Sequence, residues 1–277
     1  MATVYLNADS GDDARSYAQA QNSATPWLTP GKVNSSATTG DTCVMQESVA
    51  DFTWANITFS KGLSFVGPSI ISPARINAGN IAAGWTLGAY THLLENILFK
   101  NCPSAFLTMS GVHNVTLRGV KFDDDILLNT AKYGLLECNS TAGAVLNLDR
   151  VEFNNVRQSS ATARGLLGTN VLLGGVTITL ERVIAYWGTG SNPAAYLHYR
   201  AYDTPVVVIR NSILSNQTGG TITYGTSTNT ASYSDLHLLT GAPSGTGVIT
   251  SDPLWVDPVN GNFNLQQDSP CVGVGAP

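Results

Sequence analysis

One seven-residue pattern occurs five times along this chain. It places mostly apolar residues at the first, fourth and sixth positions and polar or charged residues between them. The five copies are LENILFK (94–100), LRGVKFD (117–123), LDRVEFN (148–154), LERVIAY (180–186) and IRNSILS (209–215). Their first residues are 23, 31, 32 and 29 positions apart. A repeat of this length built on short strands predicts stacked units that share one continuous core.

The apolar positions do not keep the helical i, i+3, i+4 spacing beyond one turn, so each copy predicts two short strands. A bend is expected at the third position, which is Asn96, Gly119, Arg150, Arg182 or Asn211. Because strand side chains alternate between faces, positions one, four and six point inward and positions two and five point outward. The sixth position therefore predicts that Phe99, Phe122 and Phe153 stack in the core.

The second position of the pattern carries mostly opposite charges. Its members are Glu95, Arg118, Asp149, Glu181 and Arg210. If the copies stack in register, these side chains form a ladder with a spacing of about 4.8 Å. We interpret the ladder as a solvated, mutually paired sheet face without a functional site.

A third strand is expected just before each copy. The segments AFLTMS (105–110), GLLECN (134–139), GLLGTN (165–170) and AYLHYR (195–200) align so that Leu107, Leu136, Leu167 and Leu197 form an inward ladder. Three strands per unit predict an all-β fold, a single-stranded right-handed parallel β-helix of about seven coils. We expect one domain over 1–277, with coils at 43–239. The segments 1–42 and 240–277 would cap the coil ends, which otherwise leave strand edges unpaired.

Composition narrows the function classes. Hydrophobic residues make up 43% of the chain and charged residues only 12%, as expected for many strands joined by turns. A net charge of −5 argues against nucleic acid as a partner. The chain has no apolar run of about 18 residues, so no membrane span is predicted. Its opening, MATVYL, does not resemble a signal peptide. The four cysteines lack metal-ligand spacing and are interpreted as buried free thiols.

The two ends of the chain carry recognisable motifs. The opening contains VYLNADSGDD (4–13), ATPWLTPGKV (24–33) and GDTCVMQ (40–46), and the close is SDPLWVDPVNGNFNLQQDSPCVGVG (251–275). These motifs resemble the ends of the pectate-lyase-like superfamily of right-handed parallel β-helix proteins. The resemblance implies the fold. It does not select one activity, because the superfamily contains polysaccharide lyases, glycoside hydrolases, epimerases, phage tailspikes and adhesins.

In the lyases of that superfamily, the polysaccharide lies between the sheet made by the third strand and the loops beside it. In the register above, Glu137 and His198 would share one outward ladder, and Asn139, Asn170 and Arg200 the next. The residues that we predict to bind substrate are Asn139, Asn170, Arg164, Tyr196, His198 and Trp187. Aromatic rings stack on sugar faces, and planar polar groups pair with hydroxyls and carboxylates. Trp187 could equally cover the edge of the core.

Two reactions remain open if the protein is an enzyme. Elimination needs a base and a cation that holds a uronate carboxylate, and Lys132, Arg164 or Arg200 could take these roles. Hydrolysis needs two carboxylates about 5–10 Å apart, and Glu137 with one of Asp123–Asp125, such as Asp124, would supply them. The 123–125 run is equally a turn. No cofactor is predicted with certainty. Calcium is the one ion left open, although three adjacent carboxylates cannot all converge on it.

The competing hypothesis is a non-catalytic structural or receptor-binding protein of the tailspike or adhesin kind. Such proteins use a stiff solenoid and are often trimers, although nothing in the sequence fixes a homotrimer. Both hypotheses predict an extracellular or virion-associated protein whose partner is a polysaccharide or a surface receptor.

Overall fold

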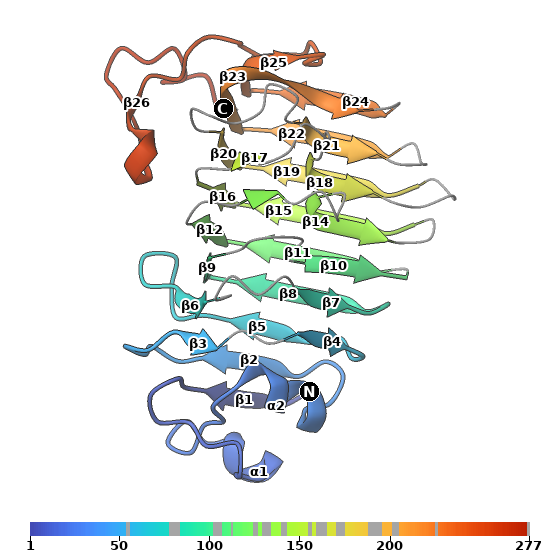
Figure 1. Cartoon of the computed structure of the whole chain (residues 1–277), viewed down its shortest axis with the longest axis vertical. Helices are drawn as coiled ribbons and strands as arrows, with labels where there is room; N and C mark the ends of the chain where they lie inside the picture. The colour runs from blue at the N-terminus through green and yellow to red at the C-terminus, as the bar shows by residue number, and fades with distance from the viewer. Residues whose placement is uncertain are drawn as a thin grey trace.

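The computed structural model describes residues 1–53, 56–77, 84–101, 107–111, 113–123, 127–128, 134–139, 143–154, 157–158, 165–169, 175–187, 196–200, 205–224 and 227–275. The chain forms a column of stacked coils whose strands run parallel to their neighbours in the next coil (Figure 1). The N-terminus lies at one end of the column, and the last strands close the other end. The predicted parallel β-helix is thus confirmed.

The first face of the column is a nine-stranded parallel sheet. Its strands are β1 (Thr3–Leu6), β2 (Thr42–Met45), β5 (Ser64–Val66), β8 (Thr91–Glu95), β11 (Asn114–Arg118), β15 (Val145–Asp149), β19 (Thr177–Glu181), β22 (Val206–Arg210) and β24 (Thr228–Ser232). The residues at the first position of the sequence pattern pair with one another from strand to strand. They form an unbroken series of paired neighbours, in the order Leu94, Leu117, Leu148, Leu180 and Ile209.

The second face contains β3 (Phe52–Thr53), β6 (Ala74–Asn77), β9 (Ile97–Lys100), β12 (Lys121–Asp123), β16 (Glu152–Phe153) and β20 (Ile184–Trp187). The third face contains β4 (Ile57–Phe59), β7 (Trp85–Leu87), β10 (Leu107–Ser110), β14 (Gly134–Asn139), β18 (Gly165–Thr169) and β21 (Tyr196–Arg200). The long strand β23 (Ile213–Tyr224) pairs with β20 and also with β21, and therefore joins the two faces. Strand β25 (Asp235–Thr240) pairs along β23. Beside the column, β13 (Leu127–Leu128) pairs with β17 (Arg157–Gln158).

The bend between the first and second faces lies where the pattern predicts it. Asn96, Gly119, Arg150, Arg182 and Asn211 all have φ between 48° and 59°. This left-handed conformation suits glycine and asparagine, whereas other residues adopt it at a cost of about 1–2 kcal/mol. The bend keeps the ladder paired, because the N–H of Asn96 donates to the carbonyl of Arg118 at 2.9 Å. Tyr233, with φ of 49°, adds a sixth bend outside the five copies.

The core is a stack of inward side chains, and the predicted phenylalanine ladder is confirmed. The rings of Phe99 and Phe122 stack with centroids 5.3 Å apart, and those of Phe122 and Phe153 with centroids 4.9 Å apart. All three rings are fully buried. Toward the N-terminus, Trp85 continues the aromatic column by an edge contact with Phe99 at 6.0 Å.

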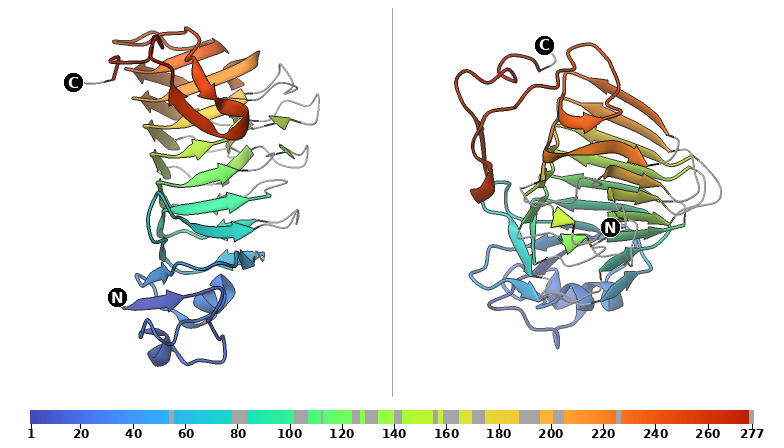
Figure 2. Two further views of the ribbon diagram at one scale, coloured as in Figure 1. Left: turned by 90° about the vertical axis from the view of Figure 1, so that its left-hand side faces the viewer. Right: turned by 45° about the horizontal axis from the view of Figure 1, so that its top comes forward.

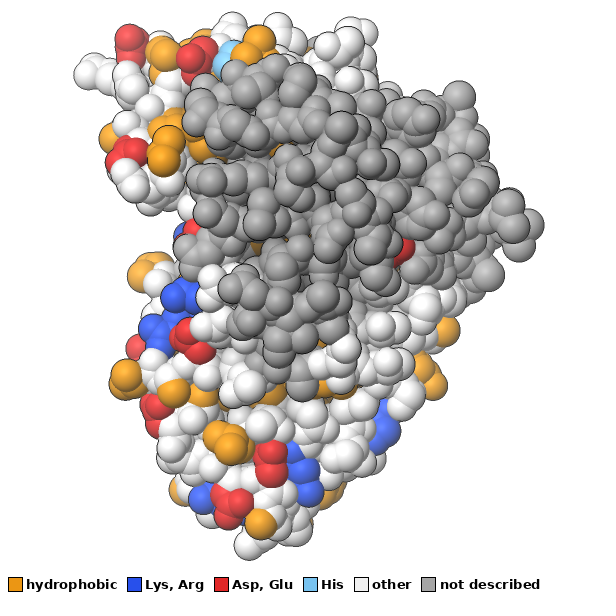
Figure 3. Space-filling view, in the orientation of Figure 1, with side chains coloured by type: hydrophobic (Ala, Val, Ile, Leu, Met, Phe, Trp, Pro, Cys, Tyr) orange, Lys and Arg blue, Asp and Glu red, His pale blue; other side chains and the backbone are white. Residues whose placement is uncertain are grey.

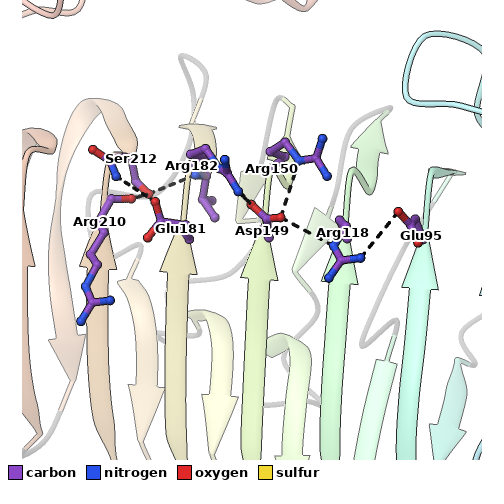
Figure 4. Close-up of polar contacts among 10 residues, drawn as sticks. Glu95, Arg118, Asp149, Arg150, Glu181, Arg182, Arg210 and Ser212 are labelled. Atoms are coloured by element: carbon purple, nitrogen blue, oxygen red, sulfur yellow. Dashed lines mark hydrogen bonds and ion pairs between the residues drawn. The ribbon is translucent and has the colours of Figure 1, made fainter. Parts of the chain in front are cut away.

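The outward charge ladder on the first face is paired along the chain itself (Figure 4). Arg118 lies between Glu95 and Asp149, at 3.8 Å and 3.7 Å. Asp149 and Glu181 are like charges on neighbouring strands. Arg182, at the bend, donates from Nε to Asp149 at 3.0 Å, so a cation lies beside this pair. The interpretation of this ladder as a mutually paired face is confirmed for Glu95, Arg118 and Asp149.

The N-terminal segment covers the first coil with two helices, α1 (Tyr17–Ala20) and α2 (Pro30–Ser36). Trp27 is fully buried, and its Nε1 donates to the carbonyl of Arg15 at 2.8 Å. Thr29 caps α2, and its hydroxyl donates to Asp13 at 2.6 Å. The PWLT segment quoted above therefore builds the cap. None of the described helices is long and apolar enough to cross a membrane.

The C-terminal segment turns back along the outside of the column (Figure 2). It forms an antiparallel hairpin of β26 (Trp255–Asp257), the short 3₁₀ helix η1 (Pro258–Asn260) and β27 (Asn262–Leu265). We call residues 255–265 the C-terminal hairpin. Phe263 contacts Trp255 within the hairpin, at 5.3 Å between ring centroids, and Tyr186 of β20 at 6.0 Å. These rings attach the hairpin to the second face.

Candidate binding clefts

The structure places two predicted site residues in the interior. Glu137 on β14 is 2% exposed, and Trp187 on β20 is 1% exposed. Leu135 and Leu166, which alternate away from the core ladder of Leu136 and Leu167, are also fully buried. Glu137 is therefore not the exposed carboxylate that the groove hypothesis expects, and its catalytic role stays a prediction. Trp187 presents no exposed ring face, which favours the core-edge alternative.

The register of β21 differs from the prediction by one residue. Leu167 pairs with His198 instead of Leu197, and Gly168 pairs with Tyr199. Glu137 pairs with Gly168, so the predicted ladder from Glu137 to His198 does not form. Arg200 pairs with Thr169, not with Asn170. The segment YLHYR has large side chains at every position, so its pattern does not fix one register.

The structure does not describe the side chains of the remaining predicted residues. Asp124, Lys132, Arg164 and Asn170 fall in segments that are not described. For Asn139, Tyr196, His198 and Arg200 only the backbone is described. Their roles in substrate binding or catalysis stay predictions.

The described surface contains a cleft on the second face instead. It has a volume of about 450 Å³ and lies between the loop before β6 and the tip of the C-terminal hairpin. Ile70, Ile71 and Pro73 form one wall, and Val259 to Gly261 form the other. We call it the hairpin cleft. In Figure 3 this side of the molecule is indented below the hairpin, with cationic and acidic side chains beneath the indentation.

The floor of the hairpin cleft is polar. Lys121 of β12 pairs with Glu152 of β16 at 3.1 Å. Asn154 donates from Nδ2 to Oδ1 of Asp123 at 2.8 Å. These residues point outward because Phe122 and Phe153, between them on the same strands, point into the core. The core ladder thus fixes the floor of the cleft.

The hairpin tip rests on this floor at one glycine. A Cβ at Gly261 would lie 2.8 Å from Nδ2 of Asn154, and the φ of Gly261 is 74°. Both the close approach and the left-handed backbone require glycine there. Asn154 consequently takes part in two features, the cleft floor and the seat of the hairpin.

A second cleft continues from the first on the other side of the 69–73 loop. It has a volume of about 570 Å³, and it shares Ile71, Pro73 and Leu98 with the hairpin cleft. Asp9, Glu47 and Arg75 contribute its charges. We call it the loop cleft. The two clefts adjoin at Ile71, Pro73 and Leu98, across the coils of β6, β9, β12 and β16, and we refer to them together as the depression.

The loop cleft is internally connected by hydrogen bonds. Arg75 pairs with Asp51 at 2.8 Å and donates to the carbonyls of Ser48 and Val49. Asp9 accepts from the N–H groups of Val49 and Ala50, at 2.6 Å and 2.8 Å. Those two backbone hydrogen bonds, from Ala50 and then Val49, lower the pKa of Asp9. The residues that line this cleft are therefore held in place before any ligand binds.

Sequence reasoning missed this depression. The fifth position of the pattern was predicted to point outward, and in three copies it is Leu98, Lys121 and Glu152. Those residues follow one another in register on the second face. The seventh position of the pattern, which includes Asp123 and Asn154, likewise places polar side chains on the outside of the second face. The C-terminal hairpin lies outside the five copies of the pattern, so the repeat could not predict that the hairpin lies beside these strands.

No model of a known protein family, no curated protein and no solved structure matches this chain. Within the described residues, no group of three or more His, Cys, Asp or Glu side chains could hold a metal ion.

Proposed function

We propose that this protein binds an extended carbohydrate chain in the depression formed by the hairpin cleft and the loop cleft. The observation that carries the proposal is a pair of adjoining clefts that share Ile71, Pro73 and Leu98 and are lined by charged and amide side chains. Carboxylate, amide, ammonium and guanidinium groups hydrogen-bond to ring hydroxyls, and clefts of this size are typical of ligand sites.

The direction of the depression suits a linear polymer. Arg75, Leu98, Lys121 and Glu152 follow one another in register from coil to coil. Successive strands are about 4.8 Å apart, so each coil offers the polymer an outward side chain at a regular interval. A chain of sugar rings along the column would thus meet a repeated surface.

The sequence resemblance supports the same reading. The motifs at both ends resemble those of the pectate-lyase-like superfamily, to which we propose the chain belongs, and many members of that superfamily act on polysaccharides. With that membership, we propose a secreted or virion-borne protein.

If the protein is also an enzyme, the carboxylates on the floor of the hairpin cleft favour glycoside hydrolysis. Asp123 and Glu152 lie on neighbouring parallel strands and are offset by two residues. Strand geometry then places their Cα atoms about 8 Å apart. Inverting glycosidases hold their two carboxylates about 6.5–9.5 Å apart, and two side chains that leave the same face of the sheet in parallel would keep about this spacing. Reducing-end assays on every glycan that binds would detect the activity.

A glycan array followed by calorimetry tests the binding proposal. The double variant Asn154→Ala, Glu152→Gln should weaken binding at least tenfold, because each change removes a polar group from the floor. Glu95→Gln, on the opposite charge ladder, is the matched control and should bind as the parent does. Absence of binding to any glycan at about millimolar concentration would contradict the proposal.

The second candidate function is a stiff structural or receptor-binding rod of the tailspike or adhesin kind, including a homotrimer. The observation in its favour is that the charge ladder on the first face is already paired along the chain. Light scattering would test the trimer, and failure on the glycan array would favour this candidate.

A further inference from the structure

We infer that the depression selects glycans that carry protonated amino groups and rejects polyuronates. This inference rests on the proposed carbohydrate binding and names the class of glycan.

The charge of the lining is the first argument. Four carboxylates line the two clefts, those of Asp9, Glu47, Asp123 and Glu152. Two cations line them, Arg75 and Lys121. The described lining thus carries a surplus of two negative charges, which attracts an ammonium group and repels a carboxylate.

The two cations are also engaged. Arg75 pairs with Asp51 at 2.8 Å, and Lys121 pairs with Glu152 at 3.1 Å. An incoming uronate carboxylate would have to break one of these ion pairs to find a cation. An incoming ammonium group meets carboxylates without breaking either pair.

Hydrogen-bonding capacity is the second argument. Asp123 accepts from Nδ2 of Asn154 at 2.8 Å, and Glu152 pairs with Lys121 at 3.1 Å. An ionised carboxylate has two oxygens that together accept about four hydrogen bonds. Ammonium and hydroxyl groups can donate to these oxygens, but an ionised carboxylate on the ligand only accepts.

The walls strengthen the discrimination. Ile71 is 94% exposed and Val259 is 59% exposed, and they belong to opposite walls of the hairpin cleft. Aliphatic side chains in this position can cover the apolar faces of sugar rings and exclude water. Lower local polarity makes each charge contact count for more.

The experiment compares three oligosaccharides of equal length by calorimetry: a glucosamine oligomer, its N-acetylated form and an oligogalacturonate. We expect the glucosamine oligomer to bind at least tenfold more tightly than the oligogalacturonate, with the N-acetylated form between them. Added salt should weaken the glucosamine complex most, because it screens charge. Asp123→Asn should reduce the preference for glucosamine over its N-acetylated form severalfold, while Glu95→Gln should leave it unchanged.

The outcomes separate the two claims. Equal or tighter binding of the oligogalacturonate would overturn the selectivity and leave carbohydrate binding intact. Absence of binding to all three oligosaccharides and to the array would overturn both. Should Asp123→Asn lower the melting temperature, Glu47→Gln provides a second test in the loop cleft, where Gln can still accept from the Ser72 hydroxyl.

Discussion

The ring of Phe122 lies almost parallel to the ring of Phe153, with centroids 4.9 Å apart and an interplanar angle of 5°. The two rings belong to successive coils, so their contact joins two units of the stack. We predict that Phe122→Ala lowers the free energy of unfolding by about 3–5 kcal/mol, because it leaves a cavity between neighbours on both sides. Urea denaturation measures the loss. Thr116→Ala, on the outward side of β11, is the control and should change stability by less than about 0.5 kcal/mol.

Acid should destabilise the column through His92. This side chain is 2% exposed, and burial lowers its pKa to about 4. Since the folded pKa lies below the unfolded value of about 6.5, stability is complete above about pH 6.5. It falls as the pH drops and levels off below about pH 4, with a total loss of about 3 kcal/mol. His113, whose pKa is also lowered by burial, adds to the effect.

His92→Leu tests the origin of this acid sensitivity. Unfolding midpoints in urea should become less dependent on pH between about pH 7 and pH 4. An unchanged slope in the variant would assign the sensitivity to other groups.

The hairpin should detach when Gly261 gains a side chain. Gly261→Ala places a methyl group 2.8 Å from Nδ2 of Asn154 and strains a backbone with φ of 74°. We expect faster hydrogen exchange across residues 255–265 than in the parent. Gly273→Ala is a matched control, because Gly273 has φ of 79° but nothing within 4 Å of the added Cβ. Hairpin exchange that is no faster in Gly261→Ala than in Gly273→Ala would contradict this prediction.

Asp41 should hold the N-terminal cap through its hydrogen bonds. It is fully buried and accepts from the Tyr17 hydroxyl at 2.6 Å, from Thr38 and from the N–H of Ala2. Burial alone would raise its pKa, but these hydrogen bonds lower it to about 2. Because the folded pKa lies below the unfolded one, the stabilisation is present above about pH 4 and is lost toward pH 2.

Asp41→Asn should cost about 2 kcal/mol near neutral pH. Tyr17→Phe, which removes one of the donors, should cost less. A neutral effect of Asp41→Asn in thermal unfolding would refute this account.

The repeat made the core and the bends predictable because both depend on residues a fixed distance apart. Asn96 and Gly119 could be assigned to bends from local preference, and Phe122 to the core from alternation. The site could not be derived in the same way. The burial of Glu137 depends on what covers the third face, and the wall at Val259 depends on a hairpin that returns from the far end of the chain. Such contacts leave no periodic signal.

The alternation of sign from Glu95 to Arg118 to Asp149 also limits how a column of this kind can change its length. Deleting the single coil that carries Arg118 would bring Glu95 beside Asp149, two like charges on neighbouring strands. Deleting the two coils that carry Arg118 and Asp149 would bring Glu95 beside Glu181, and the same conflict would follow. A deletion keeps opposite charges on neighbouring strands only when it joins an acidic position to a basic one, as one joining Glu95 to Arg210 would. The number of coils that can be removed from this column therefore depends on where the deletion begins.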